Sequence, residues 1–307
     1  MTDQSDHGAY EALIEADHDS RWAFGTGFDD PLAGVDTTMP VGVDGADLGA
    51  YCLMLADDAL VMSQRLAQWS TRAPELEEEV ALANIGLDLL GQARLLLARG
   101  AAADPSVVPV LPAGSPVPAE DALAFFREEM AFRNVRLVEL DNGDFARSSL
   151  RLLVFAAWRL ALLQQLRASR DTVLAAVAAK GVKEVTYHRD YAARWVVTLA
   201  QGTPESRRRT VAALHTVWPY VEELLGTHPV ERRLAVDGVG VDPASVREEL
   251  NDVLSQVLAA ADLATPEGPT ASAVAGRYGR HGLHTEAMGP LLAELQVVAR
   301  AHPSGLW

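Results

Sequence analysis

A glutamate and a histidine spaced four residues apart are the side chains of this chain most suited to chemistry. Glu184 and His188 lie in the stretch 182–195. If this stretch is helical, both side chains point from one face, about one turn apart, and Tyr191 and Trp195 continue that face. A carboxylate and an imidazole directed into a helical bundle are ligands from which carboxylate-bridged di-iron centres are built. The spacing therefore raises the question of whether this chain holds metal.

The complete ligand set of a di-iron bundle is not found in the sequence. Such a bundle takes one Glu from each of two helices and a Glu-x-x-His pair from each of the other two. Where the pattern needs a glutamate, one candidate helix offers Gln64. Another offers Asp88, which is followed three residues later by a glycine without a ligand atom. Tyr187 stands three residues after Glu184, so His188 is displaced from the required position by about 100° of helix rotation.

The remaining acidic candidate is Glu128. We predict that the candidate residues form a buried, metal-free polar network, the vestige of a metal site, because buried polar groups must be paired. Arg65 or Arg94 would supply positive charge to it. The alternative is a self-sufficient ferritin-like di-iron protein, an oxidase or an iron-handling protein, in which the acidic residues and the histidine bind the metal. The predicted network consists of Gln64, Asp88, Glu128, Glu184 and His188.

Three other patterns have simpler explanations than a functional site. His281, His284 and Glu286 lie close together, but the second half of this segment is also typical of a helix start, so we expect capping rather than metal binding. Cys52 is expected to be a buried, inert thiol. The arginine run 207–209 is predicted to be a solvated face, with contact to an anionic cofactor or an acidic partner as the alternative.

Composition excludes several classes of protein. The 307 residues are 49% apolar but only 6% aromatic, which favours helices over a β-sandwich. A net charge of −16 argues against nucleic-acid binding. The single cysteine cannot form a disulfide within the chain. The N-terminus lacks the features of a signal peptide, and no apolar run reaches the roughly twenty residues of a membrane span. We therefore expect a soluble, cytoplasmic protein.

Helical periodicity begins after residue 46 and predicts an all-α bundle of about eight helices with almost no strand. Asp47 is expected to cap the first helix, and Gly100 to end the second. The second helix is apolar on nearly every side, which predicts that it lies at the centre. We expect 227–241 to be irregular or a short ribbon. The predicted helices cover 47–69, 75–99, 119–140, 147–167, 172–201, 204–226, 242–263 and 285–301.

Residues 1–45 differ in composition from the helical domain predicted for 46–307. They carry ten acidic residues against one basic residue, Arg21. We predict a mostly irregular extension with one helical turn near 10–16. A solvated tail is the simplest interpretation. The alternative is an arm that wraps a partner protein, anchored by Trp22, Phe24 and Phe28.

Five stretches resemble the C subunit of bacterial phenylacetyl-CoA epoxidases, which are multicomponent monooxygenases of aerobic phenylacetate breakdown. The resemblance covers about 46–307. It does not include the acidic extension and implies nothing about its role. APELEEEVALANIGLDLLGQAR, at 73–94, and the short GLHTE motif are its most specific parts. The matching stretches are 53–69, 73–94, 139–146, 183–195 and 282–296.

The resemblance implies a ferritin-like fold and a structural role without catalytic residues. In that family of complexes, the related A subunit holds the di-iron centre and binds phenylacetyl-CoA, and a reductase supplies electrons from NADPH. The C subunit pairs with the A subunit and has no working metal site. The resemblance therefore predicts no cofactor in this chain and a di-iron catalytic subunit as its partner. Contacts with the other small subunit and the reductase, and self-association of the isolated chain, are further expectations.

Overall fold

The computed structural model describes residues 30–268, 270–271, 273–274 and 276–305. The helical turn predicted near 10–16 and the aromatic residues of the proposed arm lie outside this part. Within it the chain forms nine α-helices and no β-strand beyond one isolated bridge between Val274 and Arg277. The helices are α2 (Gly45–Ala67), α3 (Leu76–Ala103), α4 (Ala119–Phe125), α5 (Phe145–Leu166), α6 (Thr172–Gln201), α7 (Pro204–Val217), α8 (Pro229–Val236), α9 (Arg247–Ala260) and α10 (Met288–Ala301).

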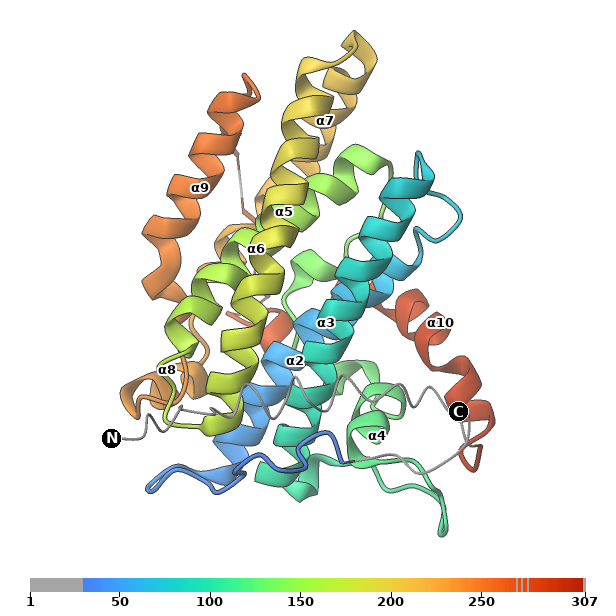
Figure 1. Ribbon diagram of the computed structural model, residues 1–307, viewed down its shortest axis with the longest axis vertical. Helices are drawn as coiled ribbons and strands as arrows, with labels where there is room; N and C mark the ends of the chain where they lie inside the picture. The colour runs from blue at the N-terminus through green and yellow to red at the C-terminus, as the bar shows by residue number, and fades with distance from the viewer. Residues whose placement is uncertain (1–29, 269, 272, 275, 306–307) are drawn as a thin grey trace, which may run out of the picture.

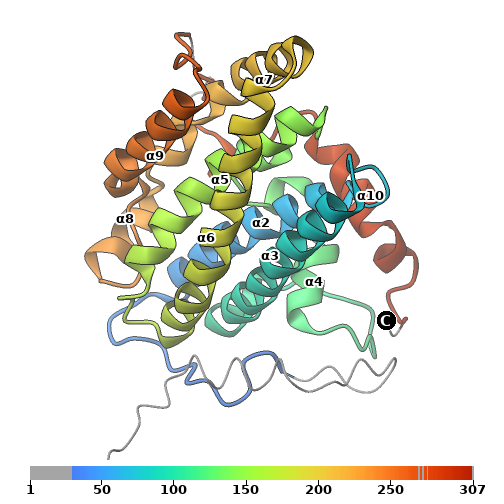
Figure 2. The same ribbon diagram turned by 45° about the horizontal axis from the view of Figure 1, so that its top comes forward.

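Four long helices form the core of a ferritin-like bundle. Helix α2 packs along α3, α5 packs along α6, and α3 also contacts α6 (Figure 1). The shorter helices surround this core. Helices α7 and α9 pack against α5 and α6, α8 packs against α2, and α4 and α10 pack together on the opposite side (Figure 2). The all-α bundle predicted from the sequence is confirmed.

The central helices are α2 and α5, rather than α3. Most residues of α2 and α5 are buried, including polar ones. Helix α3 instead leaves one face open, on which four large apolar side chains are 43 to 71% exposed. The prediction of a central α3 was wrong because an all-round apolar pattern does not distinguish a buried helix from one that exposes an apolar face. The exposed residues, named here the apolar stripe, are Leu76, Val80, Leu87 and Leu90.

Helix α3 also has the length and composition of a membrane-spanning helix, the one such helix in the described ranges. The expectation that no run was apolar enough is therefore corrected. The helix packs along α2, and its buried face carries Gln92 and Arg99. Arg99 forms a buried ion pair with Asp171, with Nη2 and Oδ2 2.6 Å apart. A helix with paired polar groups on its inner face is typical of a bundle.

The ends of the first two predicted helices are shifted. Helix α2 is capped by Asp44, whose carboxylate accepts from the backbone N–H of Ala46 and Asp47. The predicted cap, Asp47, instead forms an ion pair with Arg233. Helix α3 continues through Gly100 to Ala103. Gly100 does not end the helix but brings it close to α2, since an added Cβ would lie 3.4 Å from the backbone oxygen of Gly49.

The largest departures from the predicted helices follow residue 125. The helix predicted for 119–140 ends at Phe125, and two short 3-10 turns, Glu129–Ala131 and Arg136–Glu139, take the place of its second half. The segment between them is extended because buried carboxylates of α2 accept its backbone N–H groups. Arg133 N–H donates to Asp57 and Val135 N–H to Asp58, each over 2.8 Å. Tertiary contacts here override local helix propensity.

Three other predicted elements are also corrected. The helix predicted for 204–226 ends at Val217, just before Pro219, which cannot donate a backbone hydrogen bond and lies in a 3-10 turn. The segment 227–241 contains helix α8 rather than a ribbon. The last helix begins at Met288 instead of Thr285.

Residues 30–44 contain turns but no helix, and they pack on the bundle. Leu32, Val35 and Val43 are buried in the main core. Arg99 donates a 2.9 Å hydrogen bond to the backbone oxygen of Thr37. Residues 30–44 of the acidic extension are therefore held against the bundle, in part by Arg99 of α3. The domain boundary near residue 46 stays a prediction.

Candidate functional site

Side chains from α3, α5 and α6 form a polar cluster between these helices, which extends from buried Arg159 and His188 to Asp88, whose side chain is 38% exposed. His188 Nε2 lies 3.0 Å from Asp88 Oδ2. One helical turn away, the Gln92 amide donates to Glu184 Oε2 over 2.8 Å. The oxygen of the same amide accepts from Arg159 Nε over 2.9 Å. We call these five residues the central cluster.

Close approach of two helices makes room for the cluster. Gly181 lies on α6, one turn before Glu184 on the same face. A Cβ added at Gly181 would lie 2.9 Å from Leu163 Cδ1 and 3.3 Å from Gln92 Nε2. A larger residue would therefore push against Leu163 and the Gln92 amide, on which both Arg159 and Glu184 depend.

Burial changes the acidity of the charged groups in the cluster. Burial raises the pKa of Glu184 above its usual value, while the hydrogen bond from Gln92 opposes this change. Burial lowers the pKa of Arg159 to about 10, so its guanidinium stays protonated at neutral pH. Lys180 lies at the edge of the cluster, with Nζ 3.9 Å from Glu184 Oε1. The cluster thus holds a fixed positive charge at its centre.

The structure brings together three of the five residues predicted for the network, namely Asp88, Glu184 and His188. Glu128 lies at the surface, where its carboxylate pairs with Arg300 over 3.0 Å. Gln64 is half-buried on α2, nine residues beyond Leu55, a rise of about 13 Å along the helix. Because the Leu55 carbonyl contacts Arg159, Gln64 lies more than two turns from the cluster.

The arginine that contacts the cluster is Arg159, and not Arg65 or Arg94, which the sequence suggested. Arg65 donates to the backbone oxygen of Glu139. Arg94 pairs with Glu120, with Nε and Oε1 3.6 Å apart. Arg159 was missed because spacing along one helix does not show which neighbouring helix faces it. A signal was present, since Arg159 stands alone in the apolar run 152–163.

The residues of the cluster do not fit a di-iron pair. Two iron ions need several carboxylates and an imidazole each, whereas the cluster offers two carboxylates, one imidazole and one amide. Arg159 adds a guanidinium, which donates hydrogen bonds and cannot bind a cation. No group of three or more His, Cys, Asp or Glu residues suited to a metal ion occurs within the described residues.

Tyr191 and Trp195 continue the face of Glu184 and His188, as predicted. The Tyr191 hydroxyl donates to the carboxylate of Glu78, and Trp195 Nε1 donates to the same carboxylate over 2.8 Å. Glu78 belongs to the first turn of α3. These aromatic residues therefore tie the two helices together beside the cluster.

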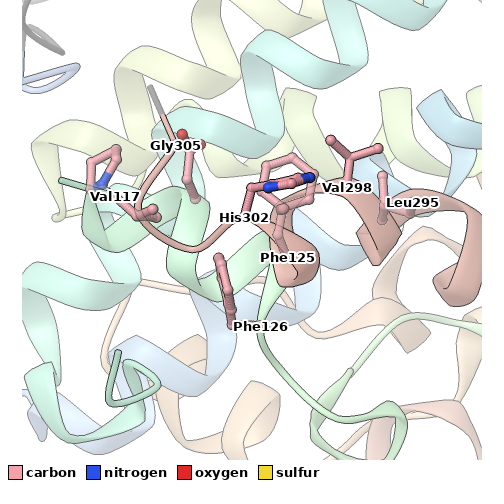
Figure 3. Close-up of a pocket in the computed structure, with 10 residues that line it drawn as sticks. Val117, Phe125, Phe126, Leu295, Val298, His302 and Gly305 are labelled. Atoms are coloured by element: carbon pink, nitrogen blue, oxygen red, sulfur yellow. The ribbon is translucent and has the colours of Figure 1, made fainter. Parts of the chain in front are cut away.

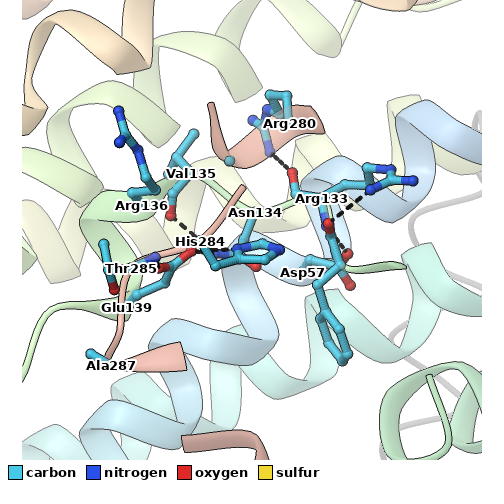
Figure 4. A network of polar contacts seen from close by, with 12 residues as sticks. Asp57, Arg133, Asn134, Val135, Arg136, Glu139, Arg280, His284, Thr285 and Ala287 are labelled. Carbon is cyan, nitrogen blue, oxygen red and sulfur yellow. Dashed lines mark hydrogen bonds and ion pairs between the residues drawn. The ribbon is translucent and has the colours of Figure 1, made fainter. Parts of the chain in front are cut away.

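A second buried network lies between α2 and the C-terminal part of the chain (Figure 4). Asp58 pairs with Arg280 through two contacts of 2.9 Å. Asp57 pairs with Arg127, which donates over 3.0 Å through Nη1. All four side chains are at most 3% exposed. We call them the aspartate clamp, since they also hold the extended segment between the 3-10 turns. Two adjacent aspartates in an otherwise apolar helix were the sequence signal.

The histidines near residue 284 contribute to this structural region. His284 Nδ1 lies 2.6 Å from Glu139 Oε1, and both side chains are buried. The backbone N–H of Thr285 donates to the same carboxylate. His281 instead packs against His228, with ring centroids 4.7 Å apart and ring planes tilted by 56°. Glu139 therefore accepts from the backbone N–H of Thr285 just before α10, although the capping of a helix starting at Thr285 is not observed.

The remaining sequence candidates have structural roles. Cys52 is fully buried, and burial raises the pKa of its thiol. Arg208 and Arg209 pair with Glu205 on the exposed side of α7, each over 2.8 Å. Arg207 pairs with Asp262. The prediction of a solvated basic face is confirmed.

A mainly apolar cavity of about 220 Å³ lies between α4 and the C-terminal half of α10 (Figure 3). Phe125, Leu295 and Val298 line it, together with His302 and Asp121. Burial, together with the carboxylate of Glu120, raises the pKa of Asp121 to about 6. The cavity shares no lining residue with the central cluster.

Known proteins resemble the chain over nearly all of the part that the structure describes. A family model described as phenylacetic acid catabolic protein matches residues 36–307. The chain is 41% identical over 260 residues to the C subunit of the 1,2-phenylacetyl-CoA epoxidase of Escherichia coli strain K12. This similarity covers 85% of the chain and 99% of the relative. It also agrees with the resemblance that the sequence motifs carried. The chain belongs to the phenylacetic acid catabolic protein family.

Proposed function

We propose that this chain is a structural, non-catalytic subunit of a multicomponent phenylacetyl-CoA epoxidase and that it pairs with the di-iron catalytic subunit. The observation that carries the proposal is the central cluster. Arg159 and Gln92 stand among Asp88, Glu184 and His188, so too few ligands remain for two irons. The identity to the C subunit of the Escherichia coli enzyme supports the same role.

The apolar stripe on α3 supports a role in pairing. Leu76 and Val80 lie one turn apart, and Leu87 and Leu90 continue the same face. A continuous exposed apolar face of this kind is typical of an interaction site. A second helical bundle fits it, because helices that pack together bury apolar side chains along their length.

Gly91 lies beside the stripe and supports close approach of a partner. A Cβ added at Gly91 would meet no atom within 4 Å, so the monomer itself gives no reason for a glycine there. An exposed glycine inside a helix costs about 1 kcal/mol relative to alanine. A partner helix whose backbone comes close to α3 would explain this cost.

The proposal has consequences for the rest of the complex. The metal and the substrate site belong to the catalytic subunit, and this chain contributes no cofactor. A further small subunit and a reductase complete the assembly, which we place in the cytoplasm. In the absence of its partner, the isolated chain is expected to self-associate through the apolar stripe.

Co-expression with the catalytic subunit tests the proposal. The two chains are expected to purify together, to give a hetero-oligomer by native mass spectrometry, and to need each other for epoxidation of phenylacetyl-CoA in the presence of the reductase. Leu87→Glu should break the complex without unfolding this chain. Val236→Glu, at an exposed valine of α8, is the matched control and should leave the complex intact. Full activity of the catalytic subunit alone would contradict the proposal.

A further inference from the structure

We propose that two arginines and two histidines beside the start of α8 form a binding site for a phosphate group, either free phosphate or the phosphate of a larger molecule. The residues come from three separate segments of the chain, so no sequence motif predicts them. In a chain with a net charge of −16, a local excess of positive charge needs an explanation of its own. The four residues, named here the basic patch, are Arg133, Arg277, His228 and His281.

Contacts of residues 281 and 282 bring the basic patch together. The ring of His281 packs against that of His228, with centroids 4.7 Å apart. The backbone oxygen of His281 accepts a 3.0 Å hydrogen bond from Arg277 Nη2. Arg133 lies against the next residue, since a Cβ added at Gly282 would be 2.8 Å from Arg133 Nη1. The four side chains are therefore neighbours in the fold.

The aspartate clamp fixes the position of Arg133. The backbone N–H of Arg133 donates to Asp57 over 2.8 Å, and its backbone oxygen accepts from Arg280 Nη1 over the same distance (Figure 4). The guanidinium of Arg133 donates through Nη1 to the backbone oxygens of Met130 and Phe132. A side chain held in this way loses little freedom when a ligand binds, which favours binding.

Neither arginine of the basic patch forms an ion pair with a carboxylate within the described residues. Asp57 attracts Arg133 but is already paired with Arg127. Burial lowers the pKa of Arg133, and repulsion by Arg127 and Arg277 adds to this effect. The patch therefore holds positive charge that its surroundings do not balance. A phosphate monoester, with a charge of about −1.5 to −2 at neutral pH, matches two such charges.

The two histidines supply neutral hydrogen-bond donors. His228 Nδ1 accepts from the backbone N–H of Val230, and His281 Nδ1 accepts from that of Tyr278. A neutral imidazole whose Nδ1 accepts carries its proton on Nε2. Burial and the charge of His281 lower the pKa of His228 to about 4, and burial and the charge of Arg277 lower the pKa of His281. Both rings are therefore neutral at pH 7 and present an N–H group.

The buried carboxylate beside His228 does not take up these donors. One oxygen of Glu231 accepts from the backbone N–H of His228 over 2.7 Å, and the other lies 3.5 Å from Arg280 Nε. The two guanidinium groups and the two imidazole N–H groups therefore remain available. Phosphate suits them, because its three terminal oxygens accept several charge-assisted hydrogen bonds at once.

The experiment titrates the full chain with inorganic phosphate at constant ionic strength, followed by calorimetry and by the NMR signals of the histidine rings. Phosphate should shift the signals of His228 and His281 and raise the pKa of both rings, because a nearby anion favours the imidazolium form. The signal of His215, which is exposed on α7, should not move. Signals of His228 and His281 that do not respond to phosphate would overturn the inference.

A matched pair of variants tests whether the basic patch itself binds the phosphate. Arg277→Gln should weaken phosphate binding about tenfold, since one charge-assisted hydrogen bond is lost. The control is Arg209→Gln, which removes another exposed arginine, one that is paired with Glu205. This control should leave phosphate binding unchanged. Equal weakening in the two variants would overturn the inference, because it would show a general effect of charge.

Two further ligands distinguish the sources of the negative charge. Coenzyme A carries a phosphate monoester, so tighter binding of coenzyme A than of inorganic phosphate would assign the site to a phosphate on a larger molecule. Equal or weaker binding would assign it to free phosphate. A poly-glutamate peptide that shifts the two histidine signals when phosphate does not would assign the patch to an acidic protein and overturn the inference. Pairing with the catalytic subunit is measured separately, so the proposed function stands or fails independently.

Discussion

The aspartate clamp and the central cluster both bury charged side chains of the same bundle, but they balance the charge differently. In the clamp each aspartate contacts its arginine directly, as in Asp58 and Arg280 at 2.9 Å. In the cluster the Gln92 amide separates Arg159 from Glu184. Direct pairing is typical of a structural contact, since a buried charge without a partner is costly. In the cluster the charge of Glu184 is instead balanced through the Gln92 amide and by Lys180, whose Nζ lies 3.9 Å from Glu184 Oε1.

Breaking the clamp should have the largest effect. Arg280→Met leaves Asp58 and Glu231 buried without their cation and should lower the free energy of unfolding by about 3–5 kcal/mol. Urea denaturation of the isolated chain measures the loss. Arg247→Met removes the exposed pair with Glu222 and should cost less than about 1 kcal/mol. Equal losses in the two variants would show that burial does not distinguish these pairs.

Removing the connecting amide of the cluster should have an intermediate effect. Gln92→Leu keeps the volume but leaves Arg159 Nε and a Glu184 oxygen without their hydrogen bonds, which should cost about 2 kcal/mol. The same denaturation experiment checks it. Asn84→Leu makes the same kind of change on the exposed side of α3 and should alter stability by less than about 0.5 kcal/mol. A neutral Gln92→Leu would mean that the amide does not connect the two charges.

The smallest effect concerns the pH dependence of stability. Burial raises the pKa of Glu184 in the folded chain, so the folded state binds this proton more tightly than the unfolded state. The stability from this proton is fully present below the unfolded pKa and is lost as pH rises through the folded pKa. Glu184→Gln should therefore gain stability relative to wild type as pH rises, as thermal denaturation between pH 4 and about 8 would measure.

Glu205 provides a control of opposite sign. Hydrogen bonds from Arg208 and Arg209 lower its pKa to about 2. The folded state then binds this proton more weakly than the unfolded state, so the stability is present above the unfolded pKa and is lost as pH falls towards the folded pKa. Glu205→Gln should lose stability relative to wild type as pH rises. If the stability of both variants relative to wild type changed with pH in the same direction, the environments assigned to the two carboxylates would be contradicted.

Sequence patterns predicted the all-α bundle and named three of the five cluster residues, because helical periodicity and four-residue spacing are visible within one helix. The shared face of Glu184 and His188 follows from their four-residue spacing. Gln92, four residues after Asp88, was not included in the predicted network. Arg159 could not be assigned in this way, since its contacts join helices that are distant in sequence. The break after Phe125 escaped prediction for the same reason. It depends on Asp57 and Asp58, which precede it by about seventy residues and accept its N–H groups.

The central claim is that this chain assists an oxygenase without holding metal itself. Its most direct test is the iron content of the wild-type chain, purified alone from cells grown with added iron and compared with the co-expressed catalytic subunit as the positive control. The account predicts no iron above the background of a Glu184→Gln variant. A pair of irons per wild-type chain, lost in that variant, would contradict it.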